Sequence, residues 1–167
     1  EGLGNSFLSN IREMSALAHV VRCFEDENIT HVDGSVDPER DVEVINLELI
    51  LADLDSVNKR IARCEKLLKT NDKENKAHFD ILQKLKNELE LGKLINLKDY
   101  EPGDQNIIKQ FQLLSSKPTF YVANIDDSEN SKNHLEKLAK IAKDLGSIVI
   151  PASIKIEQEI SLSLIHI

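Results

Sequence analysis

The stretch TFYVANIDD, residues 119–127, decides the fold. It opens with five β-branched, aromatic or small apolar residues, a composition typical of a buried strand, and this strand ends at Asn124. Two more strands are predicted, at Ala18–Phe24 and at Ser147–Ile150, the last closed by Pro151. The run at 18–24 is almost continuously apolar, which is typical of a sheet covered on both faces.

Helical patterns separate these strands. Apolar residues recur at helical spacing in residues 5–16 and 106–114, and again after the central strand, where Gly146 suits the helix end. Strands that alternate with helices need crossover connections, which are right-handed. The sequence therefore predicts an α/β fold around a parallel sheet.

A different pattern, with a 3-4 apolar spacing, begins near Asp41 and predicts two long helices. A break at residues 70–72, with Asn71 and Glu74 as a capping box, leads to a second helix that ends near Gly92. We expect an antiparallel α-helical coiled-coil arm that projects from the body. The first helix of the arm carries the seam residues Leu47, Ile50, Leu54, Val57, Ile61, Cys64 and Leu68, and the second carries Phe79, Leu82, Leu85 and Leu89.

The far end of this arm is basic although the whole chain has a net charge of −8. Residues 59–76 contain seven basic and three acidic side chains, a net charge of +4. One interpretation is a solvated helix face, and the other is a surface for an anionic partner such as ribosomal RNA. The candidate partner-binding residues are Lys59, Arg60, Arg63, Lys66 and Lys69.

The composition excludes several classes of function. No apolar run approaches the about 20 residues that cross a bilayer. Cys23 and Cys64 form no CxxC pair, and the five histidines show no ligand spacing, so we expect reduced thiols and no metal site. The acidic balance argues against broad, non-specific binding of nucleic acid.

Polar residues follow two of the predicted strands at their carboxyl ends, where ligands bind in open parallel sheets. One set is Asn124, Ile125 and Asp127, and the other includes Ser153 and Ile154. In P-loop GTPases an Asn-x-x-Asp motif at this place reads the base, because an ionised carboxylate accepts both hydrogen bonds that guanine donates. Alone, such a tetrapeptide is more often a simple turn.

Several longer stretches resemble the YchF/Obg-like ATPase family, whose members are TRAFAC-class P-loop NTPases with an OBG-type G domain. The resemblance covers nearly the whole chain and is most specific in the first forty-odd residues. The final SLSLIHI departs from it. The matching stretches are Glu1–Asn5 with Phe7–Leu8 and Ile11–Glu13, His19–Glu25, Ile29–Val32 with Gly34, Val36–Pro38, Asp41–Asn46 with Glu48–Leu49, Lys117–Pro118, Tyr121–Asn124 and Lys155–Glu157.

The resemblance implies that ATP binds better than GTP. Ile125 stands where guanine-specific proteins have Lys, and we expect it to lie against the purine. Asp127 stands where this family usually has Glu, and Asp is the guanine-type residue. The resemblance assigns the base site to Asn124, Ile125, Asp127, Ser153 and Ile154.

The resemblance also implies what the chain lacks. No GxxxxGK[ST] motif occurs in it, so it carries no predicted catalytic residue and no ligand for the Mg²⁺ of the full-length protein. We expect the C-terminal half of a Ras-like P-loop domain, without the P-loop and the TGS domain. This fragment should be inactive alone and should expose an apolar edge at the strand 18–24.

The expected organisation is a G-domain part at 1–40, the helical insertion at 41–100, a G-domain part with the base loops at 101–160, and an atypical tail at 161–167. The expected parent is a cytoplasmic, monomeric ATPase that binds the ribosome or ribosomal RNA and no membrane. The alternative is a non-enzymatic module that binds RNA or protein through the basic arm.

Overall fold

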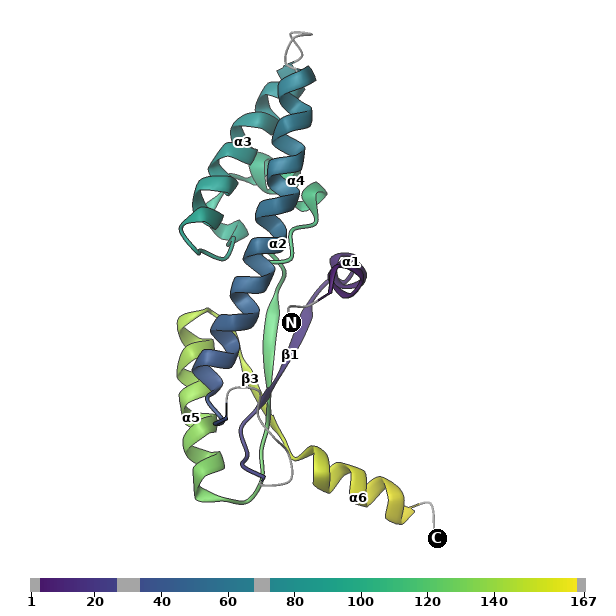
Figure 1. Cartoon of the computed structure of the whole chain (residues 1–167), viewed down its shortest axis with the longest axis vertical. Helices are drawn as coiled ribbons and strands as arrows, with labels where there is room; N and C mark the ends of the chain where they lie inside the picture. Colours follow the sequence, from purple (N-terminus) through teal and green to yellow (C-terminus); the bar gives the residue numbers. More distant parts are fainter. Residues whose placement is uncertain (1–3, 27–33, 68–72, 165–167) are drawn as a thin grey trace. The chain divides into compact units, whose positions relative to one another are not determined.

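The computed structural model describes residues 4–26, 34–67 and 73–164, which fold as two compact units (Figure 1). The arm unit comprises residues 1–15 and 44–117, and the sheet unit comprises residues 16–43 and 118–167. Helix α2 (Pro38–Leu67) begins in the sheet unit and continues in the arm unit. The predicted division into segments 1–40, 41–100, 101–160 and 161–167 stays a prediction.

The sheet unit contains a three-stranded parallel sheet, which confirms the predicted α/β fold. The strands β1 (Leu17–Arg22), β2 (Thr119–Asn124) and β3 (Val149–Ala152) lie in the order β1-β2-β3. In the register of this sheet Val20 pairs with Val122, which pairs with Ile150.

The last strand differs from the prediction, because it includes Pro151 instead of ending before it. A proline lacks the N–H that a central strand needs, but β3 is at the edge of this sheet. Strand β1 forms the opposite edge and, among the described residues, pairs only with β2. The expected open edge at β1 is therefore present in the described part of the chain.

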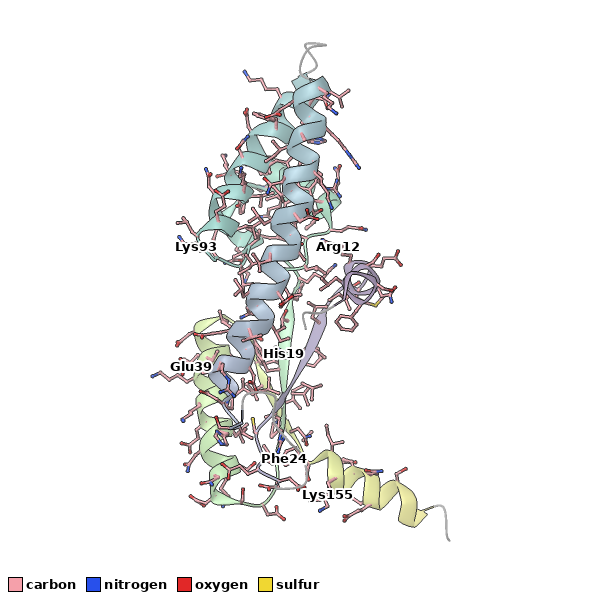
Figure 2. The ribbon with its side chains drawn as sticks, in the orientation of Figure 1. Arg12, His19, Phe24, Glu39, Lys93 and Lys155 are labelled. Carbon is pink, nitrogen blue, oxygen red and sulfur yellow. The ribbon has the colours of Figure 1, made fainter. Side chains whose placement is uncertain are left out.

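One face of the sheet is covered by α5 (Glu129–Asp144) and the start of α2. The core on this side consists of Val21, Cys23, Val42, Tyr121, Ala123, Leu138 and Ala142. Figure 2 labels His19, which belongs to β1, and Phe24, which follows that strand. Gly146 ends α5 with φ +67°, as the sequence predicts.

The other face of the sheet is apolar, and among the described residues much of it remains exposed. Because side chains alternate along a strand, this face carries Ala18, Val20, Phe120, Val122, Ile148 and Ile150, called the open face below. Val20 is 55% exposed, Ile148 64% and Ile150 45%. The expectation of a sheet covered on both faces is therefore wrong for the described chain.

The arm unit is built on α2 and α3 (Lys73–Glu90), which lie side by side in Figure 1. The predicted seam is buried or half-buried from Ile50 to Cys64, and Leu82, Leu85 and Leu89 are buried opposite. Leu47 is 52% exposed, so the seam starts later than predicted. Leu68 and the break at 70–72, with its capping box, lie outside the described residues. Gly92 adopts φ +71° just beyond α3.

A third helix belongs to the same core. Helix α4 (Pro102–Phe111) follows the short 3-10 helix η2 (Leu97–Asp99), and it contributes Ile108 and Phe111 to the cluster around Leu85. The arm unit is therefore broader than a bare two-helix hairpin.

Two further helices stand at the ends of the described chain. Helix α1 (Asn5–Arg12) is shorter than the predicted 5–16, and its Phe7 is about half exposed. Helix α6 (Ile154–Leu164) follows β3 directly. Among the described residues, no helix is long and apolar enough to span a bilayer.

Candidate nucleotide-base site

The predicted base residues come together at the carboxyl ends of β2 and β3. The side-chain Oδ1 of Asn124 accepts a hydrogen bond from the backbone N–H of Ile154 (3.3 Å). The backbone N–H of Ile125 donates to the carbonyl of Ala152 (3.0 Å). Asn124 therefore links the loop after β2 to the start of α6.

The two aspartates of the loop differ in what they do. Asp126 Oδ1 accepts hydrogen bonds from the N–H and the hydroxyl of Ser128, and its own N–H donates to Ser131 Oγ (3.1 Å). These hydrogen bonds, that from the Ser128 hydroxyl first, lower the pKa of Asp126. The carboxylate of Asp127 is exposed and makes no hydrogen bond or ion pair within the described residues. Asp126 thus holds the turn, and Asp127 is the carboxylate accessible to a ligand.

The other predicted base residues have mixed surroundings. Ile125 is half-buried and packs against the core beneath the sheet. Ile154 is 45% exposed, and Ser153 is half-buried at the start of α6. The assignment of all five residues to a nucleotide base stays a prediction.

Two serines that support this loop were not anticipated. Ser128 caps α5 by accepting a hydrogen bond from the N–H of Ser131 (3.2 Å), and Ser131 is fully buried beneath Asp126. The sequence did carry a signal, because Ser128 directly precedes an amphipathic helix and is a preferred capping residue. The burial of Ser131, by contrast, depends on the tertiary fold.

The candidate arm residues divide into two groups. Lys59 pairs with Asp55 (2.6 Å) at the surface, and Arg63 and Lys66 are exposed, whereas Lys69 lies outside the described residues. On a helix, residues 59, 63 and 66 share one face. Arg60 is different, because its guanidinium lies 5.2 Å from the centre of the Phe111 ring and donates to the Phe111 carbonyl (3.4 Å). Burial is the main cause that lowers the pKa of Arg60.

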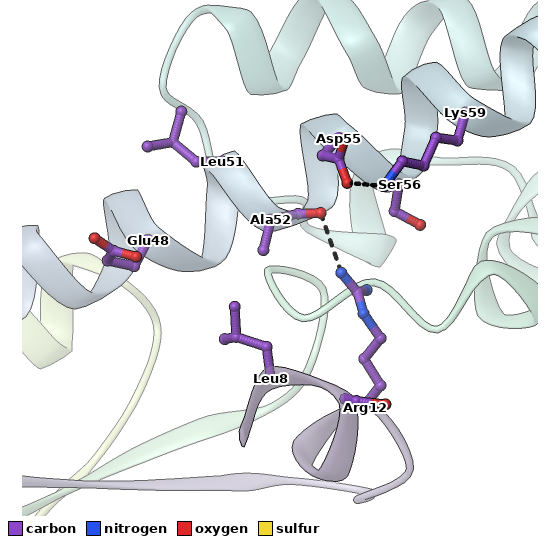
Figure 3. Close-up of a pocket in the computed structure, with 9 residues that line it drawn as sticks. Leu8, Arg12, Glu48, Leu51, Ala52, Asp55, Ser56 and Lys59 are labelled. Carbon is purple, nitrogen blue, oxygen red and sulfur yellow. Dashed lines mark hydrogen bonds and ion pairs between the residues drawn. The ribbon is translucent and has the colours of Figure 1, made fainter. Parts of the chain in front are cut away.

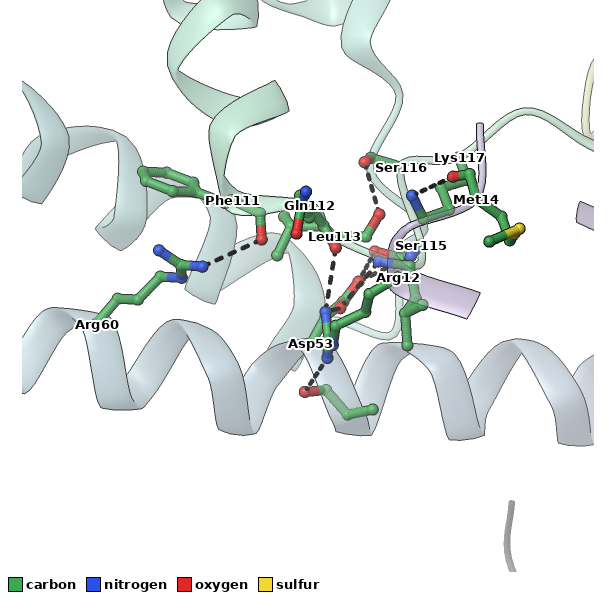
Figure 4. A network of polar contacts seen from close by, with 12 residues as sticks. Arg12, Met14, Asp53, Arg60, Phe111, Gln112, Leu113, Ser115, Ser116 and Lys117 are labelled. Carbon is green, nitrogen blue, oxygen red and sulfur yellow. Dashed lines mark hydrogen bonds and ion pairs between the residues drawn. The ribbon is translucent and has the colours of Figure 1, made fainter. Parts of the chain in front are cut away.

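A groove of about 590 Å³ lies between α1 and α2 within the arm unit (Figure 3). It is lined by Leu8, Arg12, Leu51, Ser56 and Lys59 among others, and none of the predicted base residues lines it. Beside it lies a network of polar contacts around the buried Asp53 (Figure 4). No sequence signal pointed to this network, since an acidic residue within a helix usually lies on its solvated face.

Comparison with known proteins finds relatives over nearly the whole chain. The chain is 47% identical over 165 residues to the ribosome-binding ATPase YchF of Bacillus subtilis, covering 96% of this chain and 45% of that protein. The protein of the same name from Escherichia coli O157:H7 is 43% identical over 162 residues, again covering 96% of this chain and 45% of that protein. A scan against protein-family models finds no match.

A solved structure supports the fold. The structure described as the Schizosaccharomyces pombe YchF GTPase superimposes with a TM-score of 0.80 at 32% identity, over 95% of this chain and 45% of that chain. The parallel sheet and this match define the class as the P-loop NTPase fold. Within that class, the chain is homologous to the YchF proteins over 96% of its own length. It spans about half the length of the relatives that it matches.

Proposed function

We propose that this chain supplies the base-binding loops and the arm of a ribosome-binding ATPase. The observation that carries the proposal is the Asn124–Ile154 hydrogen bond, which joins the two loops beside the accessible carboxylate of Asp127. The names of the relatives, ribosome-binding ATPase and YchF GTPase, support the same activity and the same partner.

In this proposal the chain binds the purine, and the rest of the parent protein performs the phosphate chemistry. The residues fit a base, because Asn124 fixes the loop and Asp127 presents hydrogen-bond acceptors. Mg²⁺ bound by the parent would supply charge neutralisation at the phosphates. The Gly-rich loop with its Lys and Ser/Thr is the usual cradle, and it does not occur in these 167 residues. We therefore expect the chain alone to release no phosphate from ATP.

The preference for ATP over GTP is tested by calorimetry on the full-length parent. We expect tighter binding of ATP, unchanged by Asp127→Glu, which installs the residue usual in this family. Asn124→Ala should weaken both nucleotides by about tenfold, because the loop loses the hydrogen bond that fixes it. Glu129→Gln, on an exposed side chain of α5, serves as the control. Tighter binding of GTP than ATP would show that Asp127 reads guanine and would overturn the ATPase assignment.

The second candidate function, an RNA-binding arm, is favoured by the exposed basic face at 59, 63 and 66. We expect the double reversal Arg63→Glu/Lys66→Glu to weaken binding to ribosomal RNA and to lower the slope of log affinity against log salt by about 1.5–2. Arg60 is left intact, since it packs on Phe111. The matched control is Lys137→Glu/Lys140→Glu on α5, which changes the charge equally. An equal loss of RNA affinity in both double variants would contradict a specific contact between the arm and the RNA.

The cytoplasmic location, the monomeric state and the coiled-coil nature of the arm remain predictions of this proposal. Size-exclusion chromatography with light scattering checks the monomer. A dimer at micromolar concentration would contradict it.

A further inference from the structure

The fully buried carboxylate of Asp53 in α2 has no part in the function proposed so far. It is 0% exposed and accepts four hydrogen bonds. Oδ1 accepts from Arg12 Nη1 (2.8 Å) and from the N–H of Leu114 (3.0 Å). Oδ2 accepts from the N–H and the hydroxyl of Ser115, each at 2.7 Å. A carboxylate has roughly four acceptor positions, so Asp53 can accept no further hydrogen bond.

Arg12 extends the same network from the end of α1. Its Nη2 donates to the carbonyl of Ala52 (3.1 Å), and its Nη1 also donates to the carbonyl of Gln112 (3.2 Å). Close by, Lys117 Nζ donates to the carbonyl of Met14 (2.7 Å). Figure 4 shows these partners converging from α1, from α2 and from the segment after α4. All of them belong to the arm unit.

The network around Asp53 joins three segments, and two of them, α2 and residues 112–117, are continuous in the chain with residues of the proposed function. Helix α2 continues from Asp53 to Arg63 and Lys66, which are about 15–20 Å farther along a helix of 1.5 Å rise. The segment 112–117 is followed at once by β2, whose last residue is Asn124. The Asp53 carboxylate therefore links α2, which carries the exposed basic residues of the arm, to the segment that precedes β2, the strand that ends at Asn124.

We propose that Asp53 is a positioning residue that couples the arm to the base loop. This inference rests on the proposed function. A shift of α2 cannot leave the segment 112–117 in place, because each bond lost would leave a buried donor or the carboxylate unpaired, which is costly. An RNA partner on the arm thus changes the affinity for ATP, and ATP changes the affinity for the partner by the same factor.

The test measures the Kd of ATP for the full-length parent with and without saturating purified ribosomes. The ratio of the two values is the coupling factor, and we expect it to exceed about fivefold in the unaltered protein. Asp53→Asn and Arg12→Gln should each bring the ratio to within about twofold of unity while both ligands still bind. Arg12 is partly exposed, so its variant keeps the test valid if Asp53→Asn does not fold.

Two controls separate coupling from mere stability. Asp104→Asn makes the same chemical change at the surface pair with Lys84, outside the network, and should keep the full coupling factor. Val57→Ala removes buried volume from the arm core and should lower the melting temperature without lowering the factor.

The inference is overturned if folded Asp53→Asn or Arg12→Gln keeps the full factor, if Val57→Ala loses it equally, or if the unaltered protein has a ratio of one. In that last case the proposed function survives, provided that ATP and ribosomes both bind. Failure of either ligand to bind refutes the proposed function itself.

Discussion

The arm unit and the sheet unit differ in how completely they bury their apolar side chains. The arm unit packs three helices around one continuous apolar cluster, and its buried carboxylate has every hydrogen bond satisfied. Among the described residues, the sheet unit buries one face of its three strands, and large apolar side chains such as Ile148 and Ile150 remain exposed on the other. Stability should therefore concentrate in the arm unit, because more of its apolar surface is removed from water.

The largest effect is expected at Asp53. Asp53→Ala should lower the free energy of unfolding of the arm unit by about 3–5 kcal/mol, because Arg12 and two buried N–H groups lose their partner. Urea unfolding followed by far-UV circular dichroism measures it. The control is Asp55→Ala at the exposed pair with Lys59, expected within about 0.5 kcal/mol. A similar loss of stability in both variants would contradict the expected difference between the buried and the exposed carboxylate.

A second test sets the arm core directly against the open face. Leu85→Ala should cost about 2–5 kcal/mol, because Leu85 is fully buried in the arm cluster. Ile148→Ala on the open face should change stability by about 0.5 kcal/mol or less, since its side chain is already largely in water. Chemical denaturation of both variants gives the two values. A large cost for Ile148→Ala would show that the open face is covered in solution.

A smaller effect is expected from the stacked arginine. Arg60→Gln should lower stability by about 1 kcal/mol, because the contact with the Phe111 ring and the bond to its carbonyl are both lost. Arg63→Gln, one turn farther along the exposed side, is the matched control with little expected change. If the two variants unfold at the same urea concentration, the contact between Arg60 and the Phe111 ring contributes nothing to stability. Arg60 would then be one of the exposed basic residues of the arm.

The smallest effect concerns pH and the sheet unit. Burial lowers the pKa of His19 from its ordinary 6.5, and Asp41 opposes this only in part. The unfolded chain therefore takes up the proton at a higher pH than the folded one. This contribution to stability is complete above pH 6.5 and is lost as the pH falls through the folded-state pKa. His19→Gln should remove that loss in melting curves between pH 7 and pH 5, and an unchanged pH dependence would contradict the assignment.

Most elements of the fold could be predicted because their signals are local, whereas helix α6 (Ile154–Leu164) was not anticipated. Alternation of strands and helices predicted the parallel sheet, and the spacing of Ile50, Val57, Leu82 and Leu85 predicted the arm helices that pack together. The ends were less accurate. Pro151 lies inside β3, because an edge strand tolerates a proline that a central strand does not.

The candidate base site was likewise predictable in part from the sequence. Residues 124–127 were recognisable as a strand-end motif, and the structure brings Asn124 to Ile154, 30 residues away. Spacing does not reveal that Asp126 is engaged by Ser128 while Asp127 is accessible. It also does not show that Arg60 packs on Phe111 rather than joining the exposed charges.

By itself, the sequence determined the kind of the three strands and of helices α1 to α5, the basic character of the arm and the homology to the YchF proteins, because periodicity, charge and homology are properties of the linear chain. Only the tertiary structure decided which face of the sheet is covered and which carboxylate is buried. Asp53 meets Arg12 and Ser115 from 41 and 62 residues away, and no local pattern encodes contacts at such separations.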